Sequence, residues 1–243
     1  MMTEKGNFII LNYTGTADGI VFDTTNEEKA HEADIWKNDR TYEPMVVCIG
    51  ATHIIPGFDT DLIGKELNTE YSVSVEPELA YGPVDKEQIR SAPVKNFNQK
   101  PTVGMPIHSD NRNGVIVNII GKQAIVDFNH PLAGKTLEYT YTIEGIVDKP
   151  KDKVKGIFKL FFGKEFDDID LRKGTLTITL PKGIAMDQSF VMGRAYAIHQ
   201  IFEYIPEITD VVFKEVYQRP EILPETEETS EEPQEKPVEE ATE

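Results

Sequence analysis

Residue types that usually perform covalent or metal chemistry are few and scattered in this sequence. The histidines are His31, His53, His108, His130 and His199, and the only cysteine is Cys48. The histidines form no His-x-x-x-His pair and have no cysteine partner, so we predict no metal site and no internal disulfide. Glycine-rich phosphate loops, nucleotide fingerprints and Ser-His-Asp sets are also missing, so we expect no cofactor. No motif of these kinds therefore marks a site of metal, cofactor or Ser-His-Asp chemistry.

Aromatic and apolar residues do recur in short motifs. In chain order these are Asn12-Tyr13-Thr14-Gly15, Phe22-Asp23, Ile54-Ile55-Pro56-Gly57-Phe58, Ala80-Tyr81-Gly82 and Asn129-His130-Pro131-Leu132-Ala133-Gly134-Lys135. Any one aromatic residue in a small β-rich domain is usually a core residue, and Tyr13 and Tyr81 could be core rings with hydroxyls at the rim. It is the set of motifs in this order that indicates a pocket.

As a set, the motifs resemble the FKBP-type peptidyl-prolyl isomerases. The closer resemblance is to the SlyD-like and long archaeal members, in which a chaperone domain is inserted into the flap over the active site. It covers roughly residues 5–149. It implies an α+β fold in which an antiparallel half-barrel wraps around a short helix, interrupted by a small all-β domain.

The resemblance also implies prolyl isomerase activity and a set of site residues. The expected catalytic residues are Tyr13, Phe22, Asp23, Ile54, Ile55, Phe58, Tyr81 and Tyr139, with Met45 as a further substrate-binding residue. Phe58 stands where many relatives have tryptophan, Tyr139 replaces a frequent phenylalanine, and Met45 replaces a common aromatic. These departures leave open a second hypothesis, a holdase chaperone with weak or no isomerase activity. We expect His130, in the last motif, to have a structural role.

The pocket needs strands and a helix to position it. Short apolar runs predict strands at 7–13, 20–22 and 45–49, and alternating apolar residues predict strands at 71–75 and 137–143. Apolar residues at helical spacing predict a short helix at 57–63, and a helical piece is expected around 27–34. The pair Asp18-Gly19 predicts a tight turn. Segments 1–82 and 135–149 would then form one discontinuous isomerase domain.

Residues 83–134 are expected to form the inserted domain. Short strands are predicted at 102–107, 115–120 and 124–127, residues 85–98 as a helical turn and a loop, and Asn113-Gly114 as a hairpin signal. The expected client-binding residues are Val115, Val117 and Ile119, on an exposed apolar groove or sheet edge. Alternatively this strand is simply the core of the module, and both can hold, one on each face.

A charged linker at 148–153 is expected to lead into a C-terminal α/β domain at 150–219. Its pattern predicts helices at 154–163 and 189–204 and strands at 175–180 and 210–217. Two strands cannot cover their own sheet well, so we predict a homodimer through this domain. Packing onto the first domain is the alternative.

Charge and composition exclude some classes of binding partner. The formal net charge is −17, and residues 221–243 hold ten glutamates and one lysine, so we expect 220–243 to be a disordered acidic tail. The acidic balance argues against nucleic acid. We also expect no membrane partner, because no run approaches the roughly 18 apolar residues of a spanning helix. The start lacks a signal-peptide layout, and the single cysteine favours the cytoplasm. Unfolded or partly folded polypeptides that contain proline are the expected partners.

Overall fold

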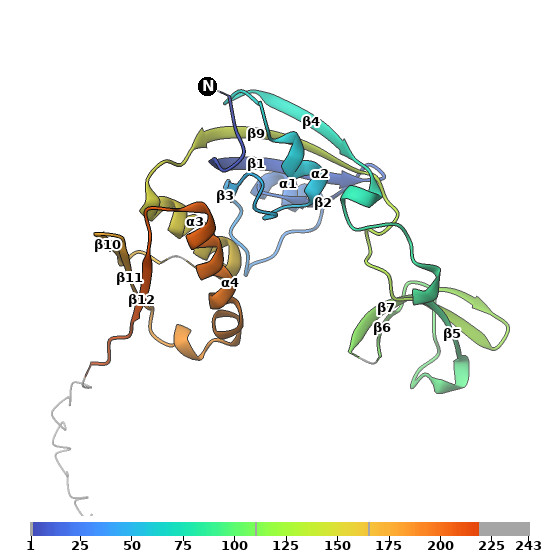
Figure 1. Ribbon diagram of the computed structural model, residues 1–243. Helices are drawn as coiled ribbons and strands as arrows, with labels where there is room; N and C mark the ends of the chain where they lie inside the picture. The colour runs from blue at the N-terminus through green and yellow to red at the C-terminus, as the bar shows by residue number, and fades with distance from the viewer. Residues whose placement is uncertain (1, 110, 165, 219–243) are drawn as a thin grey trace, which may run out of the picture.

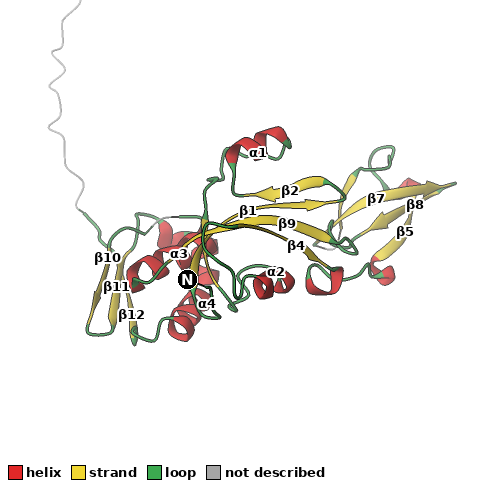
Figure 2. Cartoon of the chain, turned by 90° about the horizontal axis from the view of Figure 1, so that it is seen from above, coloured by secondary structure: helices red, strands yellow, loops and turns green. Residues whose placement is uncertain are grey.

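The structure is a computed structural model that describes residues 2–109, 111–164 and 166–218. Within these residues the strands form three sheets, so the predicted α+β class is confirmed. The N-terminal sheet lies between the insert, which holds the second sheet, and the C-terminal domain, which holds the third (Figures 1 and 2). The predicted tail at 220–243 falls outside the described residues.

The N-terminal domain is an antiparallel sheet curved around a short helix. Its strands are β1 (Phe8–Ala17), β2 (Ile20–Thr24), β3 (Met45–Cys48), β4 (Glu70–Val75) and β9 (Leu137–Ile146), and its helices are α1 (Glu27–Glu32) and α2 (Pro56–Asp61). The strand order is β2-β1-β9-β4, and β3 also pairs with β1. Phe58 and Leu62, in α2 and directly after it, pack into the concave face among buried side chains of β1 and β9.

Strand β1 is longer than the predicted 7–13, because the chain stays extended through Thr14 and Gly15. The register of β1 against β2 shifts between Gly15 and Thr16, and the strand continues to Ala17. A Cβ on Gly15 would lie 2.8 Å from the rings of both Phe22 and Tyr139. The glycine therefore lets two aromatic rings approach the strand rather than ending it. The turn at Asp18-Gly19 is confirmed, with positive φ at both residues.

The insert contains one strand more than predicted. Its strands are β5 (Ile89–Pro93), β6 (Pro106–Ser109), β7 (Arg112–Ile120) and β8 (Gln123–Asp127), in the order β5-β8-β7-β6. The expectation of only a helical turn and a loop at 85–98 was wrong at β5, a short edge strand with exposed Arg90 and Ser91. The hairpin signal at Asn113-Gly114 was also wrong, since both residues lie inside β7. Gly114 is needed there because a Cβ would lie 2.7 Å from the ring of Phe128.

The C-terminal domain has a three-stranded sheet covered by two helices. Its elements are α3 (Pro150–Phe162), β10 (Ile169–Arg172), β11 (Thr175–Thr179), α4 (Gln188–Tyr204) and β12 (Asp210–Lys214). Strand β10 was not predicted. Part of the expected linker at 148–153 is the first turn of α3, which begins at Pro150. Single-turn 3-10 helices complete the described elements at Pro77–Leu79, Lys86–Gln88, Val94–Asn96 and Ile184–Met186.

The C-terminal domain packs onto the N-terminal domain and shares a core with it. Phe8 and Cys48 belong to the same buried cluster as Phe158 and Ile201. A Cβ on Gly156 of α3 would lie 2.5 Å from the Val46 side chain of β3, so the helix backbone rests directly on the strand. The alternative of packing onto the first domain therefore describes the fold, and the homodimer stays a prediction. None of the helices in the described residues has the length and apolar character to cross a membrane.

Candidate active site

Four aromatic rings from different elements meet on the concave face of the N-terminal sheet. Phe58 of α2 stacks on Tyr139 of β9, with ring centroids 4.4 Å apart and 21° between the planes. Tyr13 of β1 meets Phe58 edge-on at 5.9 Å, and Phe22 of β2 meets Tyr139 edge-on at 5.8 Å. Pro56 at the first turn of α2 starts the helix that carries Phe58, which is almost completely buried. The predicted residues Tyr13, Phe22, Phe58 and Tyr139 therefore come together.

The predicted aliphatic residues surround these rings. Met45, Ile54 and Ile55 are partly buried and pack against the same core cluster. The backbone N–H of Ile55, just before α2, donates to no acceptor within the described residues. Such an N–H at a helix start is available to hold a carbonyl oxygen of a bound chain.

The Asp23 carboxylate is held beside the aromatic rings by two partners. The Tyr13 hydroxyl donates to its Oδ2 at 2.5 Å, and Arg40 Nη1 lies 2.7 Å from its Oδ1. Burial, and then the neighbouring Asp23, raise the pKa of Tyr13, so the phenol keeps its proton. Arg40 was missed from the sequence, because it stands in a long polar segment with no pattern to mark it. It reaches the site through its ion pair with Asp23, and its Nη2 also donates to the Thr24 carbonyl at 3.2 Å.

Tyr81 is exposed, whereas the other predicted catalytic residues are buried or partly buried. Its side chain is 39% exposed, and its hydroxyl makes no hydrogen bond to any residue that the structure describes. Burial, and then the Asp23 carboxylate, raise the pKa of Tyr81, and burial followed by Tyr81 raises that of Tyr139. The ring of Tyr81 also stacks on His130, with centroids 4.0 Å apart.

The insert exposes apolar side chains on one face of β7. Val115 is 39% and Val117 is 46% exposed, whereas Ile116 between them is fully buried. The register of β7 against β8 shifts between Ile116 and Asn118, so the alternation is broken there. The predicted Ile119 consequently turns toward the core of the module, where it is partly buried. Ile120, 63% exposed and missed from the sequence, lies outside instead.

A groove of about 660 Å³ lies on the insert. Its lining includes the apolar residues Phe97, Met105, Ile107 and Phe128 together with Arg90 and Arg112. The groove reaches both edge strands, β5 and β6, whose outer sides pair with no other described strand. Both exposed edges and apolar lining are therefore present in one small module.

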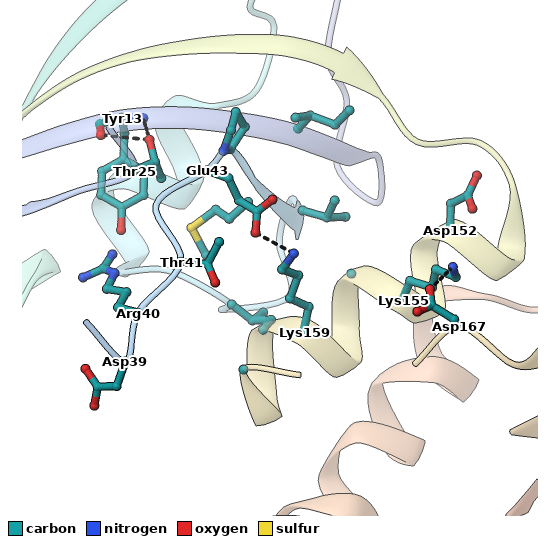
Figure 3. Close-up of a pocket in the computed structure, with 17 residues that line it drawn as sticks. Tyr13, Thr25, Asp39, Arg40, Thr41, Glu43, Asp152, Lys155, Lys159 and Asp167 are labelled. Carbon is teal, nitrogen blue, oxygen red and sulfur yellow. Dashed lines mark hydrogen bonds and ion pairs between the residues drawn. The ribbon is translucent and has the colours of Figure 1, made fainter. Parts of the chain in front are cut away.

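A second cleft, of about 580 Å³, lies between the N-terminal domain and α3 (Figure 3). Its floor is apolar, and ion pairs rim it: Lys159 lies 2.5 Å from Glu43, and Lys155 lies 2.8 Å from Asp167. Within 2–109, 111–164 and 166–218, no three or more His, Cys, Asp or Glu side chains gather in a way that could hold a metal ion.

Comparison with known proteins follows the same three-part division. A family model described as FKBP-type peptidyl-prolyl cis-trans isomerase matches residues 2–98. Models described as the FKBP26 IF domain and the FKBP26 C-terminal region match residues 92–132 and 150–218.

Similar curated proteins carry isomerase names. A short-type peptidyl-prolyl cis-trans isomerase of Methanocaldococcus jannaschii is 33% identical over 148 residues, which is 60% of this chain and 94% of that protein. The SlyD isomerase of Treponema pallidum is 34% identical over 110 residues, 43% of this chain and 62% of its own length. That of Haemophilus influenzae is 29% identical over 150 residues, 59% and 72% of the two chains. The resemblance drawn from the motifs is confirmed, and the chain belongs to the FKBP-type peptidyl-prolyl cis-trans isomerase family.

Proposed function

We propose that this isomerase accelerates rotation about X-Pro bonds in unfolded or partly folded polypeptides, using the aromatic pocket for the chemistry and the insert to hold the client. The observation that carries the proposal is the Phe58–Tyr139 stack, enclosed by Tyr13 and Phe22 and bordered by a fixed carboxylate. The proposed chemistry is non-covalent and depends on the apolar surround that these rings provide.

An apolar pocket suits this reaction because of what rotation does to the amide. The planar amide is stabilised by resonance, and the barrier to rotation is about 18–20 kcal/mol. The twisted amide has less charge separation than the planar one, so water stabilises it less well than it stabilises the planar dipole. A dry aromatic pocket consequently lowers the barrier, and each reduction of about 1.4 kcal/mol accelerates the reaction tenfold.

Polar groups at the edge of the pocket would orient the chain. We assign the Ile55 backbone N–H and the Tyr81 hydroxyl to substrate carbonyl oxygens, since neither has a partner among the described residues. The Asp23 carboxylate would act as a fixed negative group beside the rotating carbonyl. Because Tyr13 and Arg40 already hold it, it needs no reorganisation during the reaction.

One experiment distinguishes the holdase hypothesis from this proposal. NMR exchange between the cis and trans forms of an Ala-Leu-Pro-Phe peptide would be measured with and without catalytic amounts of the protein. We expect faster exchange with the wild type and a large loss for Phe58→Ala. Exchange no faster than that of the peptide alone would favour a holdase, whose pocket binds without catalysing.

The insert supports a role in holding clients. Val115, Val117 and Ile120 form an exposed apolar face, and an extended chain could add to the free edge of β5 or β6. Holding the client there would raise the concentration of its prolines at the pocket. Replacing residues 86–128 by a short Gly-Ser linker should spare peptide isomerisation and depress catalysis of proline-limited protein refolding. Equal loss on both substrates would contradict the two-site proposal.

We also propose that the homodimer forms through α4. The open face of the C-terminal sheet is polar, because Thr175, Thr177 and Thr179 point away from the core side of β11. Strand β12 exposes one apolar residue, Val212, whereas α4 exposes four, Val191, Met192, Tyr196 and Phe202. Sedimentation velocity should show a dimer for the wild type and a monomer for Met192→Glu. A wild type that stays monomeric at high concentration would contradict it.

A cytoplasmic location is likewise our proposal. Cys48 is fully buried, and burial raises the pKa of its thiol to about 12, so it should be unreactive. A chain with one buried thiol needs no oxidising compartment. Cell fractionation would test this.

A further inference from the structure

The ring of Tyr81 lies flat against the imidazole of His130. Their centroids are 4.0 Å apart and the planes differ by 8°. Tyr81 follows the 3-10 helix Pro77–Leu79 on the way into the insert, and His130 lies on the way out, between β8 and β9. The stack thus joins the two chain segments through which the insert is attached.

The imidazole of His130 is itself held by the backbone of the residues that follow it. The Leu132 N–H donates to His130 Nδ1 at 3.2 Å, and the Ala133 N–H donates to the His130 carbonyl at 2.9 Å. A ring nitrogen that accepts a hydrogen bond carries no proton, so the neutral ring has its hydrogen on Nε2. His130 therefore presents a defined flat face to Tyr81.

Further hydrogen bonds fasten the same two segments. The Gly134 N–H donates to the Gly82 carbonyl at 2.8 Å. Asn129 bonds Asp85 twice, accepting from its N–H and donating to its carbonyl, both at 2.9 Å. His130 lies between these two pairs of residues, so the hydrogen bonds that join the two segments also fix its position beside Tyr81.

Tyr81 needs such support because none of the described residues forms a hydrogen bond with its hydroxyl. The side chain is also partly exposed. A ring free to rotate would have to be ordered each time a substrate carbonyl binds, which costs conformational entropy. A stacking partner supplies that order in advance.

We propose that His130 is a positioning residue for prolyl isomerisation: by stacking on Tyr81 it aims the Tyr81 hydroxyl at the substrate carbonyl. This inference rests on the role proposed above for the Tyr81 hydroxyl. His130 itself touches no reacting atom in this scheme.

The test compares stacking with mere bulk at position 130 in the full chain. Because an aromatic pair contributes about 0.5–1.5 kcal/mol, His130→Ala should lower kcat/KM for a proline peptide roughly fivefold. His130→Leu should behave like His130→Ala, whereas His130→Phe should restore most of the activity because it keeps a flat ring. The matched control is His31→Ala, since His31 also stacks on an aromatic ring, that of Trp36, at 4.8 Å. It should leave kcat/KM unchanged.

A double-mutant cycle separates this inference from the proposed function. Tyr81→Phe should lower kcat/KM, and His130→Ala should cause no further loss in that background. A Tyr81→Phe variant with full activity would overturn the role of the hydroxyl and this inference with it. A loss for Tyr81→Phe but none for His130→Ala would overturn the inference alone. So would equal losses from His130→Ala in both backgrounds, because His130 would then act independently of Tyr81.

Discussion

Removing one hydroxyl group tests whether the fixed Asp23 carboxylate takes part in catalysis. Tyr13→Phe keeps the ring edge-on to Phe58 and removes the donor that lies 2.5 Å from Asp23 Oδ2. Arg40 remains on the other carboxylate oxygen at 2.7 Å. The carboxylate is therefore loosened and not released.

The expected magnitude follows from these contacts. A hydrogen bond to a charged group contributes about 1.5–3 kcal/mol to stability. The remaining Arg40 side chain is 42% exposed, so its ion pair is screened by solvent but still orients the carboxylate. We therefore expect Tyr13→Phe to lose about 1.5 kcal/mol of unfolding free energy, the lower end of that range. If the transition state needs Asp23 in its fixed position, kcat/KM should fall about tenfold.

The chain supplies a matched control. The Tyr141 hydroxyl donates to Asp61 Oδ2, also at 2.5 Å, and Asp61 pairs with Lys65 at 3.1 Å. This is the same tyrosine–aspartate–cation arrangement, outside the predicted set of site residues. Tyr141→Phe should lose a similar amount of stability and keep kcat/KM.

The assays are urea unfolding for stability and NMR exchange of an Ala-Leu-Pro-Phe peptide for kcat/KM. Full activity of Tyr13→Phe would refute the role assigned to Asp23. Equal losses of activity in Tyr13→Phe and Tyr141→Phe would show that activity merely follows stability.

Three further predictions concern the interface between the N-terminal and C-terminal domains and the packing inside the insert. His53 lies at the interface with the C-terminal domain, where burial lowers its pKa. As the pH falls, the unfolded chain therefore binds a proton at this histidine before the folded chain does. Stability should be full above about pH 6.5 and fall below it, with a smaller fall in thermal unfolding of His53→Gln. Gly156→Ala should cost about 1 kcal/mol, because crowding against Val46 outweighs the gain in helix propensity, and Val46→Ala should relieve the loss. Gly114→Val should collide with Phe128, lowering catalysis of protein refolding while sparing peptide isomerisation.

A specific result would contradict each of these three predictions. An identical pH dependence in His53→Gln would place the titrating group elsewhere. Gly156→Ala losses that persist unchanged in the Val46→Ala background would mean that α3 does not rest on β3 through these residues. Equal losses of Gly114→Val on peptide and protein substrates would mean that the insert acts on the pocket itself.

Local chemistry accounts for what was predicted correctly. Asp18 and Gly19 both take positive φ. Aspartate and glycine tolerate this conformation better than most residues, so the pair predicts a tight turn from its own sequence. Alternation over 71–75 and 137–143 predicted β4 and β9, since a half-buried strand needs apolar residues at every second position. Gly163 ends α3 in the left-handed conformation, as expected of a helix exit.

The errors arise where a distant partner outweighs the local signal. Asn113-Gly114 is a strong turn pair, but both residues lie in β7. Glycine is present at 114 for another reason: the ring of Phe128 occupies the space that a side chain would need. Strand β5 carries exposed polar residues and becomes a strand by pairing with β8, far along the chain. Ile119 turns inward because β7 loses its alternation against β8.

By itself the sequence determined the family, the elements with clear periodicity and the set of aromatic residues expected to line a pocket. Only the tertiary structure decided that Arg40 holds Asp23, that His130 covers Tyr81, and that Phe8 and Cys48 complete the core of the C-terminal domain. The physical reason is range. Periodicity and turn preference act over a few neighbouring residues, whereas ion pairs, ring stacks and shared cores join side chains that chain folding alone brings together.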